Sequence, residues 1–308
     1  GAAVFSRTLR EFGAKPDNTD NTAYIQAAID WSSVTGGTIT DGDPGTFTCL
    51  SQINMKDNAS LVFGPQTRIE GAFDGDLVGQ EDDNVAVENF RIYGGEWGKD
   101  ATSRRRNIFK LNMNRSVISG AVLKTFGKGK AIGFVGDSNL ITGCQILDPV
   151  NDTGSGGIRC TGGKHNMVSN CYVESGDDLL QLVPSVNGTV NVITAITNAN
   201  PGVATYSGAD TLTNGQTYYI TGGKGMTELN GQSVVVANVN TATNTFELQG
   251  VNTTSYGVYT GNAIISNSAW DNRDIDDCHF IGCTGVVLYA RACNAGLDAR
   301  EYSGVKIV

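Results

Sequence analysis

The sequence predicts an all-β fold: a parallel β-helix with an N-terminal capping helix and an inserted small β domain. A six-residue phrase is apolar at places one, four and six and carries Asn, Gly or Asp at place three; it occurs at Val87–Ile92, Ile118–Leu123, Ile141–Ile146, Val168–Val173 and Ile275–Phe280. The first four phrases start 31, 23 and 27 residues apart, which is one coil each. The fifth follows after 107 residues, so one coil plus an insertion of about 80 residues lies before it.

Each phrase reads as two strands joined by a one-residue corner. Inward residues of a straight strand alternate with period two, but here the parity changes between the first and fourth places. Asn, Gly and Asp enter the left-handed backbone region at the lowest cost, so the third place is the expected corner. Stacked phrases would place their fourth residues in one inward column: Phe90, Ala121, Cys144, Cys171 and Cys278. Coils without helices favour a β-helix over leucine-rich or ankyrin arrays.

Residues 1–40 are expected to open and cap the solenoid. Ile25, Ala28 and Ile29 recur at helical spacing, and Gly36 with Gly37 ends that pattern. A short amphipathic helix here would cover the open end of the first coil, whose strand edges and apolar side chains are otherwise exposed. The β-helix coils are then expected over residues 41–190.

The insertion is assigned to residues 191–266, and the β-helix is expected to continue over residues 267–308. Short alternating runs predict strands at Gln216–Thr221, Gln232–Val239 and Thr245–Leu248, separated by clusters of turn residues. Tyr218, Tyr219, Tyr256 and Tyr259 offer two interpretations, a sugar-binding surface or, more simply, core and edge aromatics.

Composition narrows the range of functions. The net charge is −9, which disfavours nucleic-acid binding because phosphate contacts need clustered Lys and Arg. No apolar run is long enough to cross a bilayer, so membrane insertion is not expected. The chain has two His and no Cys-x-x-Cys motif, so we expect neither a metal site nor a cofactor, and we expect the cysteines to be buried small apolar residues.

The first 40 residues resemble a known superfamily. Glu11–Lys15 (EFGAK), a polar turn and Ile25–Asp30 (IQAAID) resemble the opening motif of pectin-lyase-like right-handed β-helices, especially phage tailspikes and polygalacturonase-type hydrolases. Within the insertion, Gly225–Gly231 and Thr245–Leu248 resemble a small β module of phage tail fibres. These resemblances imply a tailspike on the virion tail, hence an extracellular protein, and a parallel homotrimer. Fold alone does not fix chemistry.

Three carboxylates are the candidate catalytic residues: Asp152, Asp177 and Asp178. Asp152 and Asp177 are 25 residues apart, about one coil, and neighbouring strands stack roughly 4.8 Å apart. Glycoside hydrolysis needs two carboxyl groups, one to protonate the leaving oxygen and one to activate water or attack the sugar. The stretch resembles the Asn-x-Asp and Asp-Asp motifs of polygalacturonases, although that family's Gly-His-Gly and Arg-x-Lys are absent. In the alternative interpretation, Ser175–Asp178 is only a turn.

The sequence therefore predicts a tailspike that binds, and hydrolyses, a bacterial capsule, exopolysaccharide or lipopolysaccharide. Trp97, Tyr172 and Trp270 are the predicted sugar contacts. Lyase chemistry has weaker support, because only Lys128 and Lys130 lie near enough in sequence to stabilise an anion. The alternative class is a non-catalytic structural or receptor-binding tail protein.

Overall fold

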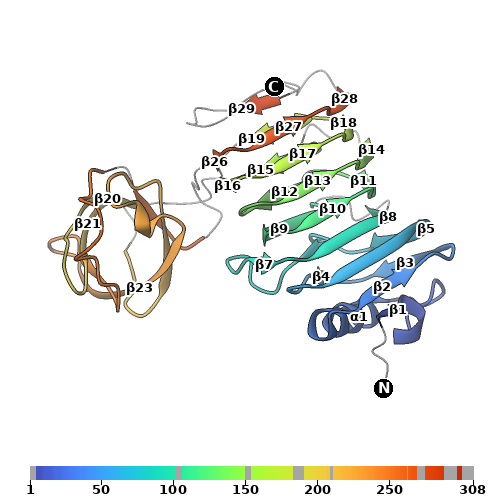
Figure 1. The fold of residues 1–308 in the computed structure, drawn as a ribbon, viewed down its shortest axis with the longest axis horizontal. Helices are drawn as coiled ribbons and strands as arrows, with labels where there is room; N and C mark the ends of the chain where they lie inside the picture. The colour runs from blue at the N-terminus through green and yellow to red at the C-terminus, as the bar shows by residue number, and fades with distance from the viewer. Residues whose placement is uncertain are drawn as a thin grey trace. The chain divides into compact units, whose positions relative to one another are not determined.

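The structure, a computed structural model, describes residues 5–100, 106–149, 154–182, 191–208, 211–261, 263–268, 275–287 and 297–299. The chain forms two compact units (Figure 1). Unit 1 is Gly1–Val183 with Ile275–Val308, and unit 2 is Pro184–Asp274. The predicted insertion, residues 191–266, lies within unit 2. No helix of the described chain is long and apolar enough to span a membrane.

Unit 1 opens with β1 (Ser6–Thr8), the 3-10 turn η1 (Leu9–Phe12) and α1 (Thr22–Thr35). The helix ends at Gly36, whose φ of 70° is left-handed. Ile25, Ala28 and Ile29 are buried against the first coils. The predicted N-terminal helix is therefore confirmed, and its apolar stripe covers the end of the solenoid (Figure 1).

The rest of unit 1 is a parallel β-helix, as predicted. Its largest sheet has 13 described strands; besides β1 these are β2 (Thr38–Asp41), β3 (Gly45–Cys49), β5 (Ser60–Gly71), β8 (Arg91–Lys99), β10 (Val117–Ser119), β11 (Val122–Phe126), β13 (Leu140–Thr142), β14 (Gln145–Pro149), β17 (Met167–Ser169), β18 (Tyr172–Ser175), β27 (His279–Ile281) and β28 (Thr284–Val287). The second sheet, with eight described strands, holds β4 (Ile53–Asn54), β6 (Val78–Gly79), β7 (Val87–Glu88), β9 (Phe109–Asn114), β12 (Lys130–Val135), β15 (Gly156–Cys160), β19 (Leu180–Leu182) and β29 (Leu297–Ala299). A third sheet pairs β16 (Gly163–Lys164) with β26 (Ile275–Asp276).

Two columns of one-residue corners run along the solenoid. The first column has left-handed φ between 48° and 61° at Asn58, Asn89, Arg115, Ser138, His165 and Asp277. The second column has φ between 52° and 69° at Gly94, Gly120, Gly143, Asn170 and Gly282. All five predicted corner residues, Asn89, Gly120, Gly143, Asn170 and Asp277, adopt this conformation. The prediction of a corner at the third place of each phrase is confirmed.

The predicted register of the first and fifth phrases is wrong. The three middle phrases stack as expected, with Ile118 beside Ile141 and Ile141 beside Val168. Their neighbours in that column are Ile92 and Phe280, five residues beyond the expected Val87 and Ile275. The outer two phrases therefore contain the first corner and the middle three the second. Asn89 and Asp277 fit the same apolar pattern and the same Asn, Gly or Asp rule as the second corners of the middle phrases, so the phrase alone does not distinguish the two columns.

The inward column after the second corner is consequently Ala121, Cys144, Cys171 and Cys283, and Cys278 does not belong to it. Phe90 and Cys278 lie in the other column, after the first corner, with Ser116, Asn139 and Asn166 between them. Asn139 and Asn166 are buried, and Asn166 Oδ1 accepts from the Asn139 backbone N–H at 3.0 Å. Side-chain amides thus satisfy inward backbone groups where the bend interrupts the ladder.

Unit 2 is a closed antiparallel barrel. Its strands are β20 (Asn191–Ile196), β21 (Val203–Ser207), β22 (Thr217–Thr221), β23 (Gln232–Asn240), β24 (Thr245–Leu248) and β25 (Ile264–Ser266), with the 3-10 turn η2 (Thr227–Leu229). Tyr206 and Phe246 pack together in its core at 5.8 Å between ring centroids. Tyr218, Tyr256 and Tyr259 pack against that core, so for these three the interpretation as core and edge aromatics holds.

Candidate functional site

The predicted Asp-Asp pair lies in the turn between β18 and β19 of unit 1. Ser175 organises that turn: its Oγ lies 2.8 Å from the Ser155 carbonyl oxygen and accepts from the Asp177 backbone N–H at 3.0 Å. The Gly176 N–H donates to the same Ser155 carbonyl at 2.9 Å. Because Ser175 supplies the hydrogen bonds of the turn, the side chains of Asp177 and Asp178 are available for other contacts.

Asp177 forms an ion pair that crosses the coils of the solenoid. Its Oδ2 lies 3.2 Å from the Nζ of Lys130, the first residue of β12. Lys130 is the register partner of Gly156, the first residue of β15. A Cβ atom at Gly156 would lie 2.3 Å from the Lys130 ammonium, so the glycine leaves the space through which the lysine reaches Asp177.

Asp178 occupies a different environment. It is 4% exposed, and its Oδ2 accepts a hydrogen bond of 2.6 Å from the Gln181 Nε2. The Asp177 side chain is 23% exposed. The two carboxylates therefore point differently, as adjacent residues near a strand must, and Asp177 is the more accessible of the two.

Asp152 and Trp270 lie outside the described residues. The expected approach of Asp152 to the Asp177–Asp178 pair therefore stays a prediction, as does the sugar contact at Trp270.

The prediction that Trp97 contacts sugar is wrong, because its side chain is 1% exposed. Trp97 faces inward from β8, stacks on Phe63 at 5.6 Å and packs against Phe109 at 5.3 Å. Its indole N–H donates to the Gly94 carbonyl at 3.0 Å. The corner at Gly94 sets the strand parity that turns residue 97 inward, and sequence analysis placed this corner elsewhere.

Tyr172 is partly exposed on β18. Its hydroxyl donates to the Glu174 Oε1 at 3.3 Å. Loss of hydration on folding raises the pKa of the Tyr172 phenol, and the neighbouring Glu174 carboxylate raises it further. Tyr172 therefore presents a neutral phenol, and its role as a sugar contact remains a proposal.

Sequence analysis missed a cluster that contains both histidines of the chain. His165 Nδ1 and His279 Nε2 each lie 2.8 Å from one oxygen of Asp277. These two hydrogen bonds lower the pKa of the Asp277 carboxyl. The sequence signal for this cluster is the first-corner column, because that column places His165 beside Asp277. No cluster of three or more His, Cys, Asp or Glu that could hold a metal occurs in the described part of the chain.

Comparison with known proteins gives similarity in structure only. No protein-family model matches this sequence, and no curated protein matches it. The tailspike protein of E. coli bacteriophage HK620, as a double mutant, is 18% identical, with a TM-score of 0.45 over 58% of this chain and 37% of that chain. The family GH82 iota-carrageenase from A. fortis is 18% identical, with a TM-score of 0.42 over 59% and 45%. PfbA, a surface adhesin of Streptococcus pneumoniae, is 14% identical, with a TM-score of 0.44 over 59% and 54%.

This chain thus spans about half or less of the length of those solved chains. Likeness at this level carries no argument about activity. The β-helix that the sequence predicts is confirmed by its own strand pairing, and the solved structures similar to this chain include a phage tailspike and a carrageenase.

Proposed function

We propose that this protein is a tailspike-type protein that binds a bacterial surface polysaccharide and hydrolyses it at Asp177 and Asp178. The observation that carries the proposal is the Lys130–Asp177 ion pair, which Gly156 makes possible, beside the buried Asp178. Ser175 already supplies the hydrogen bonds that hold this turn, so a purely structural turn would not need the Lys130–Asp177 ion pair. A pair of carboxyl groups in a hydrogen-bonded turn between two strands suits glycoside hydrolysis.

In this mechanism one carboxyl group protonates the glycosidic oxygen while the other, as carboxylate, activates water or attacks the anomeric carbon. Lys130 fixes the position of the Asp177 carboxylate, and Gln181 fixes that of Asp178. Asp152 is the further candidate for the second carboxyl group, one coil earlier in the sequence. The proposal extends to a bacterial capsule, exopolysaccharide or lipopolysaccharide as substrate, a homotrimer and a place on the virion tail; light scattering tests the trimer.

The test is depolymerisation of purified bacterial capsules, exopolysaccharides and lipopolysaccharides, followed by chromatography of the shortened chains. We expect Asp177→Asn or Asp178→Asn to lower turnover by roughly 10³-fold or more while circular dichroism stays unchanged. Glu96→Gln is the matched control, because Glu96 forms a lysine ion pair with Lys124 elsewhere on the same solenoid. Full activity in both Asp177→Asn and Asp178→Asn would refute the assignment.

Two rescue experiments can show which carboxyl group is the general acid and which is the base or nucleophile. A substrate with a good leaving group needs no proton donor, so it should restore activity to the variant that lacks the general acid. Azide should restore activity to the variant that lacks the base or nucleophile. If neither the native chain nor any variant cleaves, but the native chain binds polysaccharide, then the alternative of a non-catalytic receptor-binding protein is correct.

A further inference from the structure

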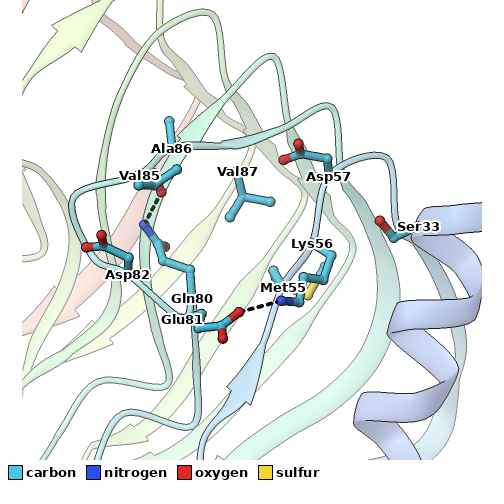
Figure 2. A pocket seen from close by; sticks show the side chains of 10 residues that line it. All are labelled: Ser33, Met55, Lys56, Asp57, Gln80, Glu81, Asp82, Val85, Ala86 and Val87. Atoms are coloured by element: carbon cyan, nitrogen blue, oxygen red, sulfur yellow. Dashed lines mark hydrogen bonds and ion pairs between the residues drawn. The ribbon is translucent and has the colours of Figure 1, made fainter. Parts of the chain in front are cut away.

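A pocket lies on unit 1, at the ends of β4 and β6 (Figure 2). Its volume is about 340 Å³, within the range of small-molecule sites. The walls come from residues 55–57, which follow β4, from residues 80–82 and 85–87, which lie between β6 and the start of β7, and from Ser33 of α1. It is thus built from three elements of one unit, and none of them contributes to the Asp177 site.

The pocket has an apolar floor. Met55 and Val87 are 1% and 6% exposed and close the base of the pocket. Val85 stands at its rim and is 60% exposed, although it is a large apolar side chain. Contact with the C–H face of a ligand would cover Val85 and remove this apolar surface from water.

Three carboxylates surround that floor, and each is held by one of its oxygens. The Asp57 Oδ1 accepts from the Glu88 N–H at 2.8 Å, and the Asp82 Oδ1 accepts from the Asn84 N–H at 2.9 Å. The Glu81 Oε2 pairs with the Lys56 Nζ at 2.7 Å (Figure 2). All three residues are exposed, and the Glu81 side chain is 78% exposed. The second oxygen of each carboxylate has no partner among the described residues, so three acceptors remain for the donors of a ligand.

We infer that this pocket binds one uncharged glycosyl unit of a polysaccharide. A pyranose has a C–H face that fits Met55, Val85 and Val87, and hydroxyl donors at its edge that fit the three carboxylate oxygens. Three carboxylates against the single Lys56 repel a uronic acid or a sulfated or phosphorylated sugar. The choice of a glycan rests on the proposed function, and the pocket would then be a binding subsite separate from cleavage.

The Met55 methyl group is a direct probe, because the chain has four methionines and only Met55 lines the pocket. We would label the methionine methyl groups with ¹³C in the full chain and titrate methyl glycosides of glucose, galactose, mannose and N-acetylglucosamine. Glucuronate and butylammonium serve as the anionic and cationic comparisons. We expect a saturable shift of the Met55 resonance with at least one uncharged sugar, and roughly tenfold weaker binding in Asp57→Asn and in Asp82→Asn. The exposed Asp17→Asn is the control variant and should bind as the native chain does.

No shift with any uncharged sugar, a shift with butylammonium alone, or an affinity in both pocket variants equal to that of the native chain would overturn the inference. Cleavage is scored separately. Asp177→Asn should lose cleavage and keep the native Met55 titration, whereas Asp82→Asn should need roughly tenfold more sugar for the same Met55 shift and keep cleavage of short oligosaccharides. A chain that shifts Met55 but never cleaves would refute the proposed hydrolysis and leave the pocket standing. Cleavage without a Met55 shift would refute the pocket as a sugar subsite and leave the proposed hydrolysis standing.

Discussion

Lys99 is a buried lysine that the fold satisfies without a carboxylate. Its side chain is fully buried at the end of β8, and its Nζ donates to the Phe73 and Gly75 carbonyls at 2.8 Å each. It also lies 3.8 Å from the centre of the Phe73 ring. Burial lowers the pKa of Lys99 to about 8, because the charged ammonium loses hydration there.

Lys99 should make stability depend on pH in the alkaline range. The pKa in the unfolded chain is about 10.4, so between pH 8 and that value the unfolded state binds a proton that the folded state does not. The free energy of unfolding of the native chain, relative to Lys99→Met, should therefore rise with pH across this window by up to about 3 kcal/mol. Urea unfolding at several pH values measures it, with the exposed Lys164→Met as control. A flat or falling difference would contradict the prediction.

Gly156 should be needed for activity rather than for folding. In Gly156→Ala the new methyl group would displace the flexible Lys130 ammonium from Asp177. We expect turnover to fall by about tenfold to a hundredfold, with little loss of stability because both partners are partly exposed. Gly133→Ala is the matched control on β12, since its nearest contact would be 3.9 Å away. Equal turnover in the two variants would remove Lys130 from the site.

At the scale of elements, the corner columns set where each coil bends. The free-energy cost of their left-handed backbone conformation can be measured. Gly143 has φ 62°, and a Cβ there would meet no atom closer than 3.9 Å, so Gly143→Ala tests conformation without a clash. We expect a loss of about 1 kcal/mol, since a left-handed backbone costs an L-residue about that much. Ser138, with φ 61°, is the reverse case, and Ser138→Asn should stabilise the coil. The thermal unfolding midpoints of both variants test these two expectations. An unchanged midpoint in both would show that the corners are not strained.

The same corners explain what sequence could and could not predict. Asn89, Gly120, Gly143, Asn170 and Asp277 were identified from residue type and pattern alone, because few residues adopt positive φ. Arg115, Ser138 and His165 turn in the same way but carry no such signature, so residue type does not trace the first column through the middle coils. The register of two phrases depends on that column, whereas the inward direction of Trp97 depends on the second-column corner at Gly94, which the phrase pattern does not report. The Asp177–Asp178 pair was found from its motif, but its ion pair depends on the missing side chain at Gly156, which no motif reports.

At the scale of the whole molecule, the two units should fold independently. The contacts of a solenoid are mainly between neighbouring coils, and the barrel of unit 2 has its own core. We expect residues 184–274, expressed alone, to give a cooperative unfolding transition. A variant of unit 1 in which a short linker joins residue 183 to residue 275 should keep its β-sheet circular dichroism. An unfolded product in either case would show that the units depend on each other.

In each coil whose corners the structure describes from Asn89 onward, the two corners are five residues apart, from Asn89 and Gly94 to Asp277 and Gly282. The rest of each coil varies freely in length, and between His165 and Asp277 it even carries a complete barrel. The spacing between the two corners is therefore constant, whereas the rest of each coil accepts changes in length and sequence. A solenoid built in this way can exchange its surface loops without shifting a single residue of its stacked core.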